Sequence, residues 1–160
     1  MEKQIYKILC PDTHIYGLGI NDIKKELYLD IDCIFNVIIG KYYKFAVSPS
    51  TIVFKNVWDL SIHLDTNESL IIDNVQVDCL GIPRNVEYVK SNSEYKVIIE
   101  CLQGSLSFNT IGGYLIKREK ETILSKEYFN ISKKRSICFS LEGDKFNFIM
   151  TPFCENPGRF

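Results

Sequence analysis

The sequence has none of the short motifs whose spacing alone specifies a reaction. A GxSxG nucleophile elbow, an HExxH zinc pair, a P-loop, a dinucleotide-binding GxGxxG and an EF-hand loop are all absent. The six cysteines stand singly and form no CxxC pair of the kind found in zinc ribbons and redox sites. We therefore expect no metal site, no cofactor and no disulfide, with reduced thiols packed as small core residues.

Charge and hydrophobicity are not concentrated as they are in nucleic-acid-binding or membrane-spanning proteins. Nineteen basic and twenty acidic residues leave a formal net charge of −1, so no strong field would attract nucleic acid. The longest apolar stretch, at residues 33–40, is far shorter than the roughly 20 residues that cross a bilayer. The first ten residues lack the apolar core of a secretory signal. We expect a cytoplasmic protein with no membrane or nucleic-acid partner.

The pattern that is present is alternation of apolar and polar residues with a period of two, which is typical of half-buried strands. In residues 27–33 the odd positions are apolar, so they are expected to face a core. The even positions Tyr28, Asp30 and Asp32 are then expected to face outward. Similar alternation recurs along most of the 160 residues, of which 46% are hydrophobic and 24% charged. One β-rich domain over residues 1–160 is the expected organisation.

Turn residues between the alternating segments predict three hairpins. They would join residues 59–65 to 69–80, residues 95–101 to 105–109, and residues 137–141 to 146–150. Ser48-Pro49-Ser50 is expected to break a strand, because proline lacks a backbone N–H. One short helix is predicted near residues 119–130. The fold class is mainly β, a single antiparallel β-barrel or β-sandwich, and periodicity does not choose between the two.

Outward positions of two predicted strands supply a candidate binding face. Its polar side chains would suit electrostatic recognition of a partner protein, although any exposed strand face carries such residues. The six residues are Tyr28, Asp30, Asp32, Asp59, His63 and Asp65.

The two histidines are the candidate catalytic residues. His63 stands among Asp59 and Asp65, so it is a possible general base, but an ordinary solvated histidine is the favoured interpretation. His14 follows Pro11-Asp12-Thr13 in a predicted loop, where turn chemistry is the simpler interpretation.

The segment from Phe45 to Leu60 resembles a family of small bacterial proteins with a P-[AS]-T-[LI]-V-F-x-N-V core, here Pro49 to Val57. A weaker similarity continues through Gly112-Gly113-Tyr114-Leu115. The resemblance implies a bacterial cytosolic protein and transfers no catalytic or ligand-binding residue.

We expect a non-enzymatic binding protein, for example an immunity-type or regulatory partner of another protein. A β-barrel that encloses a small apolar or amphipathic ligand is one alternative. An enzyme that uses His14 or His63 with nearby acids is the other. Oligomeric state is left open.

Overall fold

The computed structural model describes residues 2–65, 69–91, 93–126 and 137–150. This part of the chain forms one short helix, α1 (Ile5–Ile8), and eleven strands. The strands are β1 (Glu2–Gln4), β2 (His14–Asn21), β3 (Glu26–Ile38), β4 (Lys44–Lys55), β5 (Trp58–Leu64), β6 (Leu70–Gly81), β7 (Glu94–Cys101), β8 (Gly104–Thr110), β9 (Gly112–Lys117), β10 (Thr122–Leu124) and β11 (Asp144–Ile149). The predicted mainly β fold is confirmed. In the described ranges no helix is long and apolar enough to cross a membrane.

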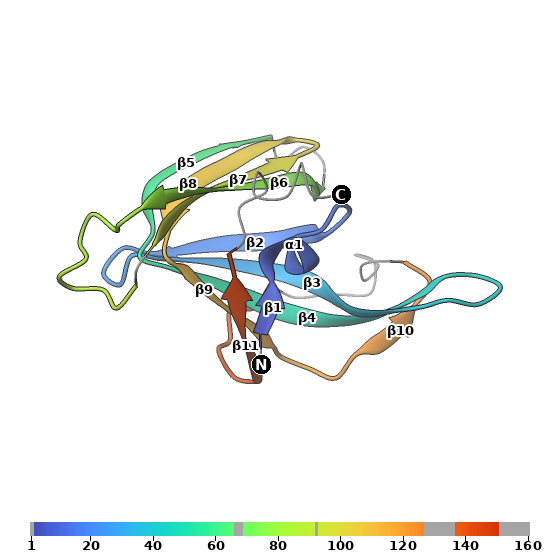
Figure 1. Ribbon diagram of the computed structural model, residues 1–160. Coiled ribbons are helices and arrows are strands. Elements are labelled where there is room, and N and C mark those ends of the chain that lie inside the picture. Colours follow the sequence, from blue (N-terminus) through green and yellow to red (C-terminus); the bar gives the residue numbers. More distant parts are fainter. Residues whose placement is uncertain (1, 66–68, 92, 127–136, 151–160) are drawn as a thin grey trace, which may run out of the picture.

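The strands join into one mixed, mostly antiparallel sheet that is not closed into a barrel. Its order is β1-β11-β9-β4-β3-β2-β6-β7-β8-β5, with β10 beside β4 and a parallel pair only between β1 and β11 among the described pairings. Strands β2 and β6 share only two residue pairs, and there the sheet folds over, so that β5 to β8 lie above β2, β3, β4 and β9 (Figure 1). The result is two layers with a common interior.

Alternation along the strands fills this interior, as the period of two predicted. The inward residues Leu27, Leu29, Ile31 and Cys33 of β3 are fully buried. They pack in one apolar cluster with inward residues of the other layer, such as Val97 and Phe108, and with Ile5 and Ile8 of α1. The alternation is interrupted in β6, because the β6–β7 register shifts between Ile72 and Asn74.

Two of the three predicted hairpins are wrong. Strands β7 and β8 do form a hairpin closed at Cys101 and Gly104, as expected. Strand β5 instead pairs with β8, in a Greek-key arrangement, rather than with β6, which follows it in sequence. Residues 137–141 form no strand, and β11 pairs with β9 and β1. Periodicity identifies a strand but carries no information about its partner.

Pro49 does not break its strand, contrary to the prediction. Strand β4 runs through it and pairs there with β3. The Pro49 carbonyl accepts a hydrogen bond from the Arg118 N–H, on the side where the neighbouring strand changes from β9 to β10. The N–H and C=O of one strand residue point to the same edge of the strand. The N–H that proline lacks would therefore have pointed into the gap between β9 and β10, so no strand hydrogen bond is lost there.

The short helix is α1, not the segment near residues 119–130. Residues 122–124 of that segment form strand β10, which pairs with Phe45 to Val47 of β4. Hydrogen bonding to an available sheet edge outweighs the weak helical spacing of the local sequence. Residues 127–130 of the predicted helix lie outside the described residues.

Candidate functional site

A candidate site lies at one end of the two layers, which we call the loop end: residues 21–26, 55–60, 82–91 and 109–112. Three residues other than glycine have left-handed backbone there, Lys25 (φ 52°), Asn56 (φ 51°) and Asp59 (φ 54°). Such conformations cost free energy, so they persist where surrounding contacts hold them. Three such residues in one region indicate that tertiary contacts hold the backbone of these loops in one conformation.

Trp58, the single tryptophan of the sequence, is the centre of the loop end. Two cations lie over its ring, with Lys25 Nζ and the Arg84 guanidinium carbon each 5.3 Å from the ring centroid. The indole N–H donates a hydrogen bond of 3.1 Å to Asn56 Oδ1. Cation–π contacts and this hydrogen bond hold the half-buried ring in one orientation.

A reciprocal amide pair ties two loops together beside Trp58. Asn56 Nδ2 donates to Asn85 Oδ1 at 2.9 Å, and Asn85 Nδ2 donates back to Asn56 Oδ1 at 2.8 Å. Asn56 is buried, so its satisfied amide avoids the cost of an unpaired polar group. The pair fixes the loop after β4 against residues 82–91.

Arg84 connects two carboxylates from different strands. Its Nη2 lies 2.8 Å from Asp59 Oδ2, and its Nε lies 3.5 Å from Oε1 of the buried Glu94. Asn109 Nδ2 donates a second hydrogen bond, of 3.1 Å, to Asp59 Oδ2. The hydrogen bond from Arg84 lowers the pKa of Asp59 below its usual value, and the same contact raises the pKa of Arg84. Both groups are therefore charged at neutral pH.

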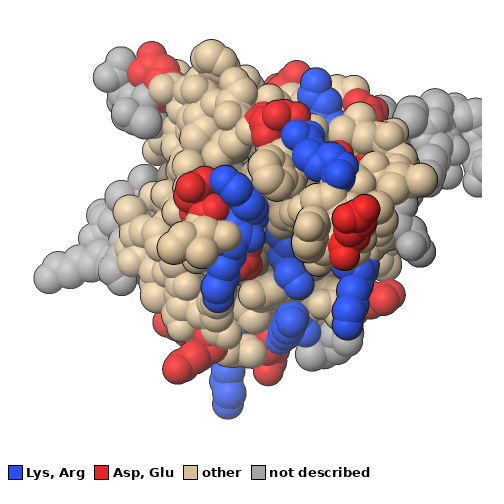
Figure 2. Space-filling model, turned by 90° about the vertical axis from the view of Figure 1, so that its left-hand side faces the viewer, with Lys and Arg blue, Asp and Glu red and all other residues tan. Residues whose placement is uncertain are grey.

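Two neighbouring hollows open on this end. The first, about 220 Å³ and here called the Trp58 hollow, is lined by apolar parts of Ile20, Val57, Trp58 and Leu60 together with charged residues at its rim. The second, about 440 Å³ and here called the lysine hollow, is lined by Lys24, Lys55, Asn56, Tyr88, Val89, Lys90 and Ile111, with Glu26 shared between the two. Figure 2 shows Lys and Arg side chains gathered over the centre of this end, with acidic side chains among them.

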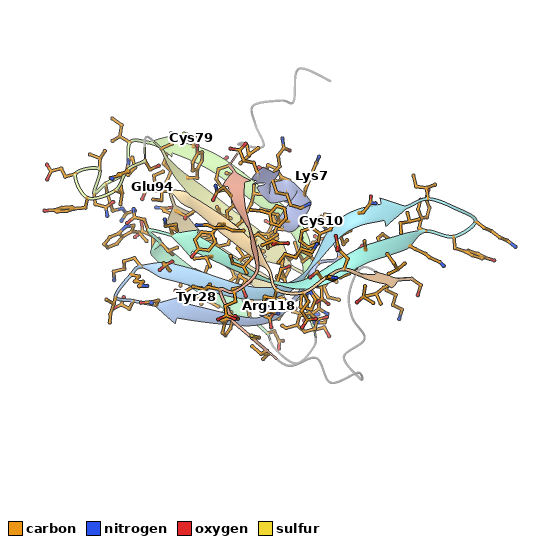
Figure 3. All side chains as sticks on the ribbon, turned by 90° about the horizontal axis from the view of Figure 1, so that it is seen from below. Lys7, Cys10, Tyr28, Cys79, Glu94 and Arg118 are labelled. Atoms are coloured by element: carbon orange, nitrogen blue, oxygen red, sulfur yellow. The ribbon has the colours of Figure 1, made fainter. Side chains whose placement is uncertain are left out.

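A second polar cluster lies away from the loop end, on the outer side of β3. Asp30 and Asp32 were expected to face solvent, and this is wrong, because both are fully buried. Arg118 Nη2 lies 2.7 Å from Asp30 Oδ1, the Cys138 N–H donates to Asp30 Oδ2 at 2.9 Å, and the Tyr16 hydroxyl donates to Asp32 Oδ2 at 2.6 Å. Figure 3 shows Arg118 on this layer, well away from Glu94, the β7 residue that contacts Arg84 of the loop end.

Residues 137–141 cover this outer face and explain the burial. Thr51 donates a hydrogen bond of 2.9 Å to the Ser140 carbonyl, and Arg118 Nη1 contacts the Cys138 carbonyl. The covering segment packs on β2 where glycines leave room, since a Cβ at Gly17 would come within 2.9 Å of the Ile137 side chain. The cluster thus attaches a C-terminal segment to the sheet.

The structure does not bring the six predicted face residues together. Tyr28, Asp30 and Asp32 lie on the outer side of one layer, and His63 and Asp65 belong to the edge strand of the other layer and the residue after it. Only Asp59 belongs to the loop end. Sequence analysis missed Arg84 and Asn85 as site residues, although a lone tryptophan between Asn56 and Asp59, two residue types that tolerate left-handed backbone, was an available signal.

The histidines occupy contrasting places. His63 is exposed and within hydrogen-bonding distance of Ser61, with 3.0 Å between Nε2 and Oγ. His14 is buried, and its ring stacks on Tyr16 at a centroid distance of 4.4 Å. Neither lines the hollows described above.

The thiols are only partly in the core. Cys33 and Cys101 are buried as expected, whereas Cys79 and Cys138 are exposed, because they lie outside the apolar cluster. Cys154 lies outside the described residues. No group of three or more potential metal ligands occurs within the ranges that the structure covers.

Comparison of the chain with protein-family models, with curated proteins and with solved structures finds no match in any of the three. The resemblance of residues 49–57 to a small bacterial family therefore stays a prediction. The case for a function rests on the geometry of the loop end.

Proposed function

We propose that this protein is a non-enzymatic binding protein whose loop end recognises a partner protein. The partner would place an apolar side chain in the Trp58 hollow and an adjacent Asp or Glu in the lysine hollow. The observation that carries the proposal is Trp58 itself, held by Lys25, Arg84 and Asn56 at the mouth of an open hollow. Tryptophan and arginine are the residues most enriched at the energetic centres of protein interfaces.

Rigidity of the site supports binding. The Asn56–Asn85 amide pair and the Arg84 ion pairs hold the loops before any partner arrives. Little conformational entropy is then lost on association, which improves affinity for a given contact area.

Charge favours an acidic partner rather than the basic one that the predicted acidic face would have suited. Three lysines line the lysine hollow against one glutamate. Two of the three acids that line the Trp58 hollow already have cationic partners, since Asp22 pairs with Lys25 at 2.6 Å and Asp59 pairs with Arg84. The lysines are therefore the groups with charge available to a ligand.

The alternatives have less structural support. A substrate would reach buried His14 only after rearrangement, and His63 lies on an open strand surface. The open sheet does not provide the closed barrel that an enclosed ligand was expected to occupy.

Selection from a random peptide library on the purified protein tests the proposal. Enriched peptides are expected to combine a large apolar residue with a neighbouring Asp or Glu, and to change the fluorescence of the single tryptophan on binding. Lys55→Glu should weaken them about tenfold or more, because reversal of one contacting charge costs at least about 1.4 kcal/mol.

The matched control is Lys120→Glu, an exposed lysine remote from the loop end that changes the net charge equally. Equal affinity of the selected peptides for the two charge-reversed variants would contradict the proposal. So would a library that yields no peptide responsive to Trp58→Phe.

A further inference from the structure

The hairpin of β3 and β4 extends beyond the rest of the sheet as an arm. At its outer end Val37 pairs with Phe45 and Ile38 with Lys44, and β10 braces β4 only as far as Phe45. In Figure 1 this hairpin projects far from the two layers, past the label of β10. We call residues 37–44 the arm tip.

The arm tip exposes large apolar and aromatic side chains. Ile39 is 78% exposed, Tyr42 74% and Tyr43 64%, and both Val37 and Ile38 are also exposed. Solvent exposure of five such residues in one short hairpin is unfavourable unless something covers them.

These apolar side chains point to both sides of the hairpin. Val37 and Ile38 are successive strand residues, so their side chains project from opposite faces. A hairpin that docks on another protein needs one apolar face, with the other face left to water. A tip that is apolar on both faces is suited instead to an apolar medium that contacts both faces at once.

The charge of the arm has one sign. Residues 33–58 contain no Asp or Glu, and the arm tip carries Lys41 and Lys44. Lys41 Nζ lies 5.7 Å from the Tyr42 ring centroid, so a cation accompanies the exposed aromatic. Lysine stems lie along apolar surface while their ammonium groups reach an anionic layer.

We propose that the arm tip is a contact site for the surface of an anionic lipid bilayer. Ile38 and Ile39 enter the acyl boundary, Tyr42 and Tyr43 lie at the level of the headgroups, and the two lysines approach lipid phosphates. Tyrosine at the interface and lysine beside it are the arrangement that membrane-associated segments use. Pairing of β3 with β4 extends to Ile38 and Lys44, so backbone groups at the base of the arm tip are hydrogen-bonded within the hairpin, which lowers the cost of approaching an apolar boundary.

The sequence predicted no membrane partner because no segment is long enough to span a bilayer. A hairpin that lies in the interface needs no spanning segment. The loop end stands at the opposite side of Figure 1, so the two sites can be occupied together.

Flotation with lipid vesicles tests the inference. The full chain is expected to bind vesicles of phosphatidylcholine with 30% phosphatidylserine, to bind pure phosphatidylcholine at least tenfold more weakly, and to be released by salt. Lys41→Ala/Lys44→Ala should reduce binding to the anionic vesicles about 25-fold, because each lysine contributes roughly fivefold. Ile39→Ser/Tyr42→Ser should reduce it at least tenfold on both kinds of vesicle.

Two controls separate the arm tip from exposed residues in general. Ile23→Ser removes an isoleucine that is still more exposed but lies at the loop end, and Lys96→Ala removes an exposed lysine of β7 in the other layer. Neither should change vesicle binding. As the arm tip lies outside the core, its variants should keep the circular dichroism spectrum and melting temperature of the parent protein.

A tryptophan placed at the tip gives an independent readout. In a Trp58→Phe background, Ile39→Trp should shift its emission to shorter wavelength with anionic vesicles, as its ring leaves water. No binding to anionic vesicles would overturn the inference, as would equal binding of parent and arm-tip variants. Self-association lost on Ile39→Ser/Tyr42→Ser, without vesicle binding, would assign the tip to a second copy of the chain and equally overturn it.

Discussion

Burial, rather than distance, should decide the strength of the ion pairs in this protein. Arg118 and Asp30 lie 2.7 Å apart with their side chains 8% and 0% exposed, whereas Lys25 and Asp22 lie 2.6 Å apart with 38% and 87% exposed. Asp30→Asn leaves a buried guanidinium without its counter-charge, which should reduce the free energy of unfolding by about 3–5 kcal/mol. Asp22→Asn should reduce it by about 0–1 kcal/mol, because water screens the exposed pair.

Urea unfolding followed by circular dichroism measures both variants, with similar slopes against urea expected if only stability changes. Arg118→Met should also destabilise strongly, because it leaves the buried Asp30 carboxylate without the cation. The double variant Asp30→Asn/Arg118→Met should then be more stable than the sum of the single effects implies, by at least about 1 kcal/mol. Strictly additive losses, or an Asp30→Asn cost no larger than that of Asp22→Asn, would refute the reasoning.

Three further predictions concern pH, thiol reactivity and backbone packing. Arg84→Gln should return the lowered pKa of Asp59 to its usual range of about 4, and NMR titration measures this change. In the parent protein the Asp59–Arg84 pair contributes stability above the usual pKa of Asp59, and this contribution is lost as the pH falls through the lowered pKa. Burial raises the pKa of the Cys33 thiol to about 12, so iodoacetamide at pH 8 should modify exposed Cys79 and Cys138 long before Cys33. Equal rates of modification at the three cysteines, measured by mass spectrometry, would contradict the burial of Cys33. Gly113→Ala should destabilise by about 3 kcal/mol, because its Cβ would lie 1.8 Å from the Val53 carbonyl oxygen and the backbone would have to shift. Gly19→Ala, with its nearest contact at 3.6 Å, should cost less than about 1 kcal/mol, so similar melting temperatures for the two variants would be the contrary result.

Local pattern was sufficient for the inner side of the sheet. Leu27, Leu29 and Ile31 face the core because a strand turns successive side chains to opposite sides, a rule that needs no knowledge of neighbouring strands. The same rule placed Asp30 and Asp32 on the outer side correctly but could not say what covers them. Their cover comes from Arg118 and Cys138, 88 and 108 residues further along the chain from Asp30.

The loop end shows the same division. Sequence marked Asp59 as a candidate binding residue. Its contact with Arg84 depends on β5 pairing with β8 and on residues 82–91 folding back over Trp58. Side-chain geometry of this kind depends on groups from several strands, so no single stretch of sequence contains it.

Composition and alternation by themselves determined that this chain folds as a β-rich domain and which side chains of β3 face its interior, because both follow from burial of apolar surface on a two-residue repeat. Only the tertiary structure decided the strand partners, the change of residues 122–124 from predicted helix to strand, and the gathering of Trp58 with Arg84 and Asn56. Those outcomes depend on which backbone edges and charged groups meet across long separations in the chain. Free energies of pairing between distant segments settle them, and the local pattern does not encode those energies.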